Sequence, residues 1–76
     1  MRELLEFLVR EIVDDPDAVE VTETEDDRGT LLSLRVAPDD MGKVIGRAGR
    51  TARAIRTVVK AGAIRSGARV SVEIVE

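Results

Sequence analysis

Cysteine and histidine are both absent from this chain of 76 residues. Without cysteine the protein has no disulfide bond and no thiol chemistry. The two absences together exclude a metal site built from cysteine or histidine and a catalytic imidazole. The remaining candidates for catalysis are carboxylates in residues 14–27 and 39–40, where turns, an edge strand and a helix cap are expected. We therefore predict that the protein is not an enzyme and uses no metal or cofactor.

Long apolar segments are also missing. No run approaches the roughly 18 apolar residues of a membrane-spanning helix. The first apolar stretch is interrupted by Arg2, Glu3 and Glu6, which does not fit a signal peptide. We expect a cytoplasmic protein with no membrane partner and no small-molecule substrate. The length of the chain predicts a single domain over residues 1–76, with a modest hydrophobic core.

Charge is distributed unevenly along the chain. Residues 1–42 carry 13 acidic and 4 basic side chains, whereas residues 43–76 carry 2 acidic and 8 basic ones. The formal net charge is −3, yet no acidic residue occurs between Lys43 and Val72. Such a split favours one face that attracts an anion and another that repels it. Chance clustering on a solvated helix face is the alternative.

The first half of the sequence predicts one helix and two strands. Residues 2–13 place leucines at helical spacing among glutamate and arginine, which indicates an amphipathic helix that ends before Pro16. Residues 19–25 are rich in β-branched side chains and acidic at the far end, which is typical of an edge strand. After a turn signal at residues 26–29, residues 30–36 alternate as a strand does. The two strands are expected to form an antiparallel hairpin.

The second half predicts two helices and a third strand. Residues 38–40 have the pattern of a helix start with an aspartate as N-cap, and Gly46 ends this short helix. A longer helix is expected from residue 47 to about residue 61. A turn bracketed by glycines follows over residues 62–67, and residues 69–75 form the last strand.

These elements predict an α+β fold in the order α-β-β-α-α-β, with three helices packed on one face of a three-stranded mixed sheet. The strand at 30–36 is expected in the centre, antiparallel to 19–25 and parallel to 69–75. At about 100° per residue, the longer helix separates an apolar side from a basic side. The apolar side holds Ala48, Ala52, Ile55, Val58 and Val59, and the basic side holds Arg50, Arg53, Arg56 and Lys60.

A glycine-punctuated corner, Gly46-Arg47-Ala48-Gly49, joins the two expected helices. The start of a helix presents unpaired N–H groups and a partial positive charge, and glycine lets a ligand approach the backbone closely. Arg47 and Arg50 add full charges, so the corner suits a phosphate backbone. A tight turn that needs glycine only for its angles is the alternative. The spacing fits neither the dinucleotide-binding fingerprint nor a P-loop.

With this element order, the segment Val44-Ile45-Gly46-Arg47-Ala48-Gly49 resembles the G-x-x-G loop of a type II KH domain. The longer stretch APDDMGKVIGRAGRTARAIRTVVKA is similar to the KhpA family of small bacterial RNA-binding proteins, and the resemblance covers essentially the whole chain. It implies that the loop holds about four unpaired nucleotides of single-stranded RNA in a groove between the paired helices and the sheet. Ala52 departs from the KH pattern, which often has isoleucine or leucine at that position.

The resemblance also implies which residues bind RNA. The loop would hold phosphates, Ala52 and Leu34 would help to line the groove, and basic side chains would stand at its rim. The predicted RNA-binding residues are Lys43, Val44, Ile45, Gly46, Arg47, Ala48, Gly49, Arg50 and Arg53. Phe7 is the only aromatic residue, so base stacking of the kind used by RRM and OB-fold proteins is not expected. Backbone, charge and aliphatic contacts predict weak, salt-sensitive binding.

Two functions remain open at this point. One is an RNA-binding protein that acts as an RNA chaperone or post-transcriptional regulator. The alternative is a protein-interaction module in which RNA binding is secondary. For that alternative the resemblance implies a homodimer, or a heterodimer with KhpB (also called Jag or EloR). A short chain with a modest core would gain stability from such an interface.

Overall fold

The computed structural model describes residues 1–75, and these form three α-helices and one three-stranded sheet. The helices are α1 (Arg2–Arg10), α2 (Met41–Ile45) and α3 (Arg50–Arg65), and the strands are β1 (Glu20–Asp26), β2 (Gly29–Arg35) and β3 (Val70–Ile74). Short 3₁₀ turns occupy Pro16–Ala18, Pro38–Asp40 and Arg47–Gly49. The predicted order α-β-β-α-α-β is confirmed.

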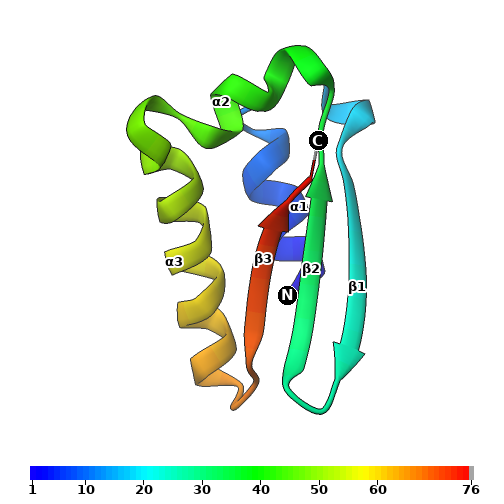
Figure 1. The fold of residues 1–76 in the computed structure, drawn as a ribbon, viewed down its shortest axis with the longest axis vertical. Helices are drawn as coiled ribbons and strands as arrows, with labels where there is room; N and C mark the ends of the chain where they lie inside the picture. Colours follow the sequence, from blue (N-terminus) through cyan, green and yellow to red (C-terminus); the bar gives the residue numbers. More distant parts are fainter. Residues whose placement is uncertain (76) are drawn as a thin grey trace.

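The sheet has the order β1-β2-β3, so β2 lies in the centre (Figure 1). β1 runs antiparallel to β2, with Val21 opposite Leu34, and β3 runs parallel to β2, with Ile74 opposite Leu34. Because side chains alternate between the faces of a sheet, these three residues share one face. The predicted mixed sheet is confirmed, and both β1 and β3 are edge strands.

The core lies between that face of the sheet and the helices, as in the predicted type II KH arrangement (Figure 1). It joins Leu32, Leu34, Val70 and Val72 of the sheet to Leu5 and Val9 of α1, Val44 of α2, and Ile55, Val59 and Ala63 of α3. Burial of these aliphatic side chains provides the main stabilisation of the fold. No helix among residues 1–75 has the length and apolar character needed to cross a bilayer.

Helix α1 ends three residues earlier than predicted. Its last turn tightens where the Ile12 amide donates to the carbonyl of Val9, at 3.0 Å. The Val13 amide also donates to the Val9 carbonyl, at 3.1 Å. The amides of Asp14 and Asp15 then donate to the side chain of Asp40 at 3.2 and 3.1 Å instead of to helix carbonyls. A tertiary contact therefore redirects the chain before Pro16 is reached.

Gly62 lies inside α3, so the prediction of a turn beginning there is wrong. A Cβ atom at Gly62 would stand 2.6 Å from the terminal methyl group of Met1, a flexible side chain that could move aside, and at an ordinary 3.7 Å from Leu4 of α1. The helix continues to Arg65, and Gly67, with φ +78°, follows its end. A glycine in the left-handed region just after a helix is a common stop.

Candidate nucleic-acid interface

The corner between α2 and α3 is a tight, irregular turn. Gly46 ends α2 with φ 74° and ψ 172°, a combination that is almost restricted to glycine. Ala48 and Gly49 then adopt left-handed angles, with φ 57° and 74°. The Gly49 amide donates to the Gly46 carbonyl at 3.2 Å, and α3 begins at Arg50. The backbone thus turns sharply and presents the start of a helix of 16 residues.

The two glycines of this corner have different surroundings. A Cβ atom at Gly46 would stand 2.3 Å from Oγ1 and 2.9 Å from the backbone nitrogen of Thr51. At Gly49, nothing lies within 4 Å of the same position. Gly46 is therefore required by packing inside the corner, whereas Gly49 leaves open space on its surface.

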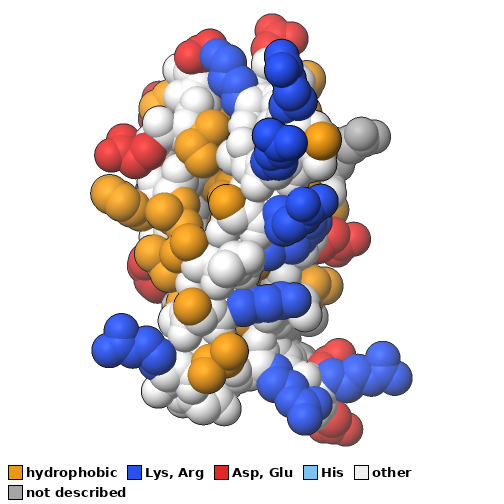
Figure 2. All heavy atoms as spheres, turned by 90° about the vertical axis from the view of Figure 1, so that its left-hand side faces the viewer, with side chains coloured by type: hydrophobic (Ala, Val, Ile, Leu, Met, Phe, Trp, Pro, Cys, Tyr) orange, Lys and Arg blue, Asp and Glu red, His pale blue; other side chains and the backbone are white. Residues whose placement is uncertain are grey.

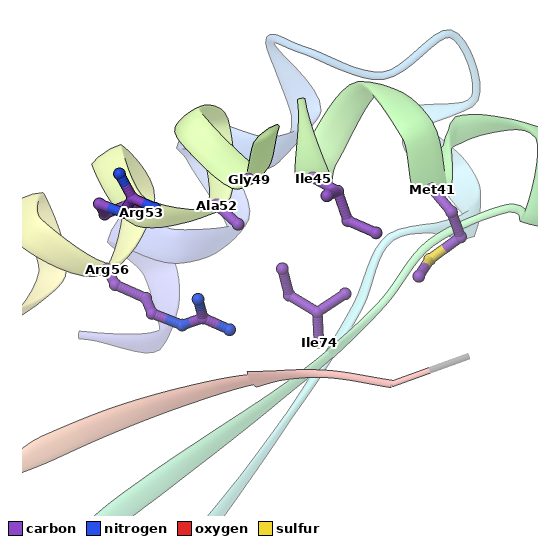
Figure 3. A pocket seen from close by; sticks show the side chains of 7 residues that line it. All are labelled: Met41, Ile45, Gly49, Ala52, Arg53, Arg56 and Ile74. Atoms are coloured by element: carbon purple, nitrogen blue, oxygen red, sulfur yellow. The ribbon is translucent and has the colours of Figure 1, made fainter. Parts of the chain in front are cut away.

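A groove of about 390 Å³ opens beside Gly49, between α2, α3 and β3 (Figure 3). Its lining residues are Met41 and Ile45 of α2, Gly49 of the corner, Ala52, Arg53 and Arg56 of α3, and Ile74 of β3. In Figure 3 the Ile74 side chain rises from β3 into the space below Ile45 and Ala52, while Arg56 reaches across from α3. The groove combines an aliphatic surface with guanidinium groups on the α3 side.

Basic side chains form a band along one side of α3, and hydrophobic side chains gather on the other side (Figure 2). The exposed basic residues of the corner and this helix include Arg47, Arg50, Arg53, Arg56 and Lys60. Within residues 1–75, no carboxylate lies within ion-pair distance of any of them. Their charges are therefore available to an anion from solvent.

Comparison with known proteins agrees with this geometry. The model of the family described as KhpA/KhpB, KH domain, matches residues 2–74. The chain belongs to the KhpA/KhpB KH-domain family. It is 52% identical to the RNA-binding protein KhpA of Clostridium acetobutylicum, over 99% of this chain and 100% of that one. It is 57% identical to the RNA-binding protein KhpA of Streptomyces coelicolor, over 100% of this chain and 92% of that one.

Only some of the residues predicted from the KH resemblance line the groove. Ile45, which is 39% exposed, Gly49 and Arg53 do so, together with the smaller Ala52. The exposed side chains of Arg47, Ala48 and Arg50 lie at or next to the corner, outside the set that lines the groove. Ala52 is only 5% exposed, and as a small side chain it leaves room in a place where a larger one would project.

Val44 and Leu34 were expected to line the groove from the KH resemblance, but neither lies on its surface. Both side chains have 0% exposure and belong to the core. Each lies on the inward side of its own element, α2 for Val44 and β2 for Leu34, so solvent and ligands do not reach them. Their contribution to this KH domain is packing beneath the groove.

Sequence reasoning missed Met41, Arg56 and Ile74 as groove residues. Met41 and Ile74 are partly buried against the core and also face the groove. The parallel register that sets Ile74 opposite Leu34 brings the end of β3 toward α2. The available signal was the predicted position of β3 at a sheet edge, which leaves one side of that strand uncovered.

Lys43 lies away from the groove lining and is already paired. Its ammonium group donates a hydrogen bond to the carboxylate of Asp14, and this bond raises the pKa of Lys43 above its ordinary value. Lys43 is therefore a cation at neutral pH, but an RNA phosphate would have to compete with Asp14 for it.

Asp40 is the one buried charged residue among those the structure describes, at 2% exposure. Asp40 occupies the N-cap position of α2, as predicted, but its side chain makes no hydrogen bond that caps the helix. The carboxylate accepts the Asp14 and Asp15 amides instead. These bonds satisfy a buried charge and attach α2, and with it one wall of the groove, to the segment after α1.

Proposed function

We propose that this chain binds single-stranded RNA in the groove between α2, α3 and β3, with the phosphate backbone along the corner at residues 46–49. The observation that carries the proposal is the open groove beside Gly49, flanked by arginines that no carboxylate of residues 1–75 neutralises. The relatives from Clostridium acetobutylicum and Streptomyces coelicolor are both named RNA-binding proteins. The proposal extends that activity to this KH domain.

The geometry supports contact with phosphates and contact with bases by different residues of the site. Amide groups at the start of α3 would contact phosphates through the partial positive charge of the helix end. The guanidinium groups of Arg47 and Arg50, which are exposed at or next to the corner, would contact phosphates through their full charges. Ile45, Ala52 and Ile74 would contact the faces of unpaired bases. A site of this kind holds about four nucleotides. Use of this binding as an RNA chaperone or post-transcriptional regulator is part of the same proposal.

Replacing both Arg47 and Arg50 with glutamine tests the electrostatic part of this proposal. Each phosphate contact to a single strand adds about 0.7 to the slope of log affinity against log salt concentration. We therefore expect the slope to fall by about 1.4 in the double variant, measured by fluorescence anisotropy with a labelled single-stranded RNA. Arg65→Gln, at the exposed far end of α3, is the matched control. An unchanged slope in the double variant would contradict the assignment of these arginines to phosphates.

A second candidate function is an interaction module that forms a homodimer, or a heterodimer with a KhpB-like protein. The observation that favours it is the set of large hydrophobic side chains on the helices outside the groove. Phe7 of α1 is 60% exposed, and Val58 and Ile64 of α3 are 45% and 75% exposed. The prediction that Val58 packs on the sheet is wrong, because the buried stripe of α3 is narrower than the sequence pattern suggested. Contact with another chain would remove these side chains from water.

Sedimentation over a range of protein concentrations tests this second function. We expect the average mass to rise with concentration, and the rise to be smaller in Val58→Asp and Ile64→Asp, since each places a charge among the exposed apolar side chains. Thr57→Asp, on an exposed neighbouring position of α3, controls for added charge. A monomer at high micromolar concentration would count against self-association and leave only the heterodimer.

A further inference from the structure

Arg56 is the one groove arginine that the structure shows anchored to the sheet. It lies on α3, and its Nε atom donates a hydrogen bond to the Val72 carbonyl at 3.3 Å. The backbone groups of residues 69 and 75 are bonded to β2, as shown by the bonds between Thr30 and Arg69 and between Val75 and Leu34. The backbone groups of successive residues in a strand point to opposite edges, so the odd-numbered residues of this segment face β2 and the even-numbered ones face away. The Val72 carbonyl therefore points to the open edge of the sheet. Arg56 is thus attached to the uncovered side of β3.

This anchor leaves a defined set of donors in the groove. Guanidinium has five N–H groups and no acceptor. With the Nε–H bonded to Val72, the four N–H groups on the two Nη atoms remain. Figure 3 shows the Arg56 side chain crossing from α3 toward β3, with its guanidinium nitrogens in the space beside Ile74. A planar group attached at one side has less rotational freedom to lose when it binds, so it can recognise a partner by geometry as well as by charge.

A donor-only group of this shape discriminates between base edges. Guanine presents two adjacent acceptors, O6 and N7, and paired contact with arginine is the commonest specific contact to that base. An unpaired cytosine also presents two adjacent acceptors, O2 and N3. Adenine places an amino donor beside N7, and uracil places an N–H between its two carbonyls. For adenine or uracil, one donor of the arginine would face another donor or remain unpaired, which costs binding free energy.

We propose that Arg56 is a specificity-determining residue, which selects a base with two adjacent acceptors, guanine or cytosine, at one position in the groove. This inference rests on the proposed function. Arg47 lies on the exposed corner and Arg50 directly follows it, both outside the groove lining. Contact with phosphate carries no sequence information. Selection by base is therefore assigned to Arg56 rather than to the positive charge of the band as a whole.

The test compares four RNA oligonucleotides that differ at one base. Labelled oligouridines with a single central A, C or G, and the all-uridine parent, are titrated with the full chain by fluorescence anisotropy. For the wild type we expect the G or C oligonucleotide to bind at least about fivefold more tightly than the A oligonucleotide, the lower bound for a paired contact. In Arg56→Gln the preference for G or C over A should be lost or reversed, because a glutamine amide offers one donor and one acceptor, which match the adenine edge rather than two adjacent acceptors.

Two further variants separate base selection from charge and from folding. Arg56→Lys keeps the charge and can still donate one bond to Val72, but it lacks the planar pair of donors, so it should also lose the preference. Lys60→Gln removes one charge from the same helix outside the groove lining, and it should leave the preference unchanged. If Arg56→Gln does not fold, as judged by circular dichroism, Arg56→Lys decides the question.

The possible results separate this inference from the function on which it rests. A wild type that binds all four oligonucleotides equally, or a preference that persists in both Arg56 variants, would overturn the inference and leave RNA binding intact. Equal loss for every oligonucleotide in Arg56→Gln, with the preference kept, would overturn it as well and assign Arg56 to phosphate contact. A wild type that binds none of the four RNAs would overturn the proposed function itself.

Discussion

Replacement of Gly49 with aspartate is expected to weaken binding of single-stranded RNA by at least about 30-fold, because juxtaposed like charges cost several kcal/mol. Gly49 lines the groove, and its Cβ position is open, with no atom within 4 Å. The new carboxylate would therefore point into the space where a phosphate is proposed to lie. The backbone of Gly49 is left-handed, with φ 74° and ψ 13°, and aspartate tolerates this conformation better than most residues do. Fluorescence anisotropy with a labelled RNA measures the loss.

Gly67→Asp is a close control for this experiment. Gly67 has φ +78° and likewise nothing within 4 Å of its Cβ position, so the substitution has a similar backbone strain and the same change in charge. It follows the end of α3, a helix about 24 Å long, and lies far from the corner. Gly49→Asn adds a further comparison, since it retains the size of aspartate without the charge. If Gly49→Asp and Gly67→Asp bind RNA equally well, the phosphate path proposed along the corner is wrong.

Gly46→Ala is expected to lower the free energy of unfolding by about 3 kcal/mol, from backbone strain and overpacking together. The added methyl group would stand 2.3 Å from Thr51 Oγ1 and 2.9 Å from the Thr51 nitrogen, and the backbone at φ 74° and ψ 172° disfavours any side chain. Since small domains have total stabilities of about 5–15 kcal/mol, the loss is a large fraction. Denaturation with urea, followed by circular dichroism, measures it.

The control for this prediction is the other glycine of the corner. Gly49→Ala meets no neighbouring atom, so only the left-handed backbone opposes it, at a cost of about 1–2 kcal/mol. Thr51→Ala combined with Gly46→Ala should recover part of the stability, because it removes the nearest of the clashing atoms. Equal destabilisation by the two glycine substitutions would show that the clash with Thr51 does not contribute to the loss of stability.

These two experiments address the two interpretations of the corner that the sequence left open. The structure assigns a packing requirement to Gly46, which is a sufficient reason for a glycine there. It shows no such requirement at Gly49, whose only constraint is a backbone angle. A role in RNA binding is therefore tested at Gly49, where a change in affinity can be separated from a change in folding.

The sequence alone was sufficient for the element order, the mixed sheet and the position of the corner. Alternation at residues 30–36 identified which side of that strand faces the core, and helical periodicity did the same for Ile55 and Val59 of the longer helix. These features depend on the repeat of a strand or a helix, which is a local property of the chain. The family assignment likewise came from contiguous residues around the corner and is confirmed by the match over residues 2–74.

Contacts between remote segments were decided only by the tertiary structure. Whether an apolar side chain is core, as Val44 is, or lines a groove, as Ile74 does, depends on what packs over it. The same holds for Asp40, which binds amides 25 and 26 residues away, and for Gly62, which lies against Met1. A local pattern states which side of an element faces inward. The strand order, the parallel register and the close approach of the helices determine how far neighbouring elements cover that side. No short stretch of sequence encodes these three features.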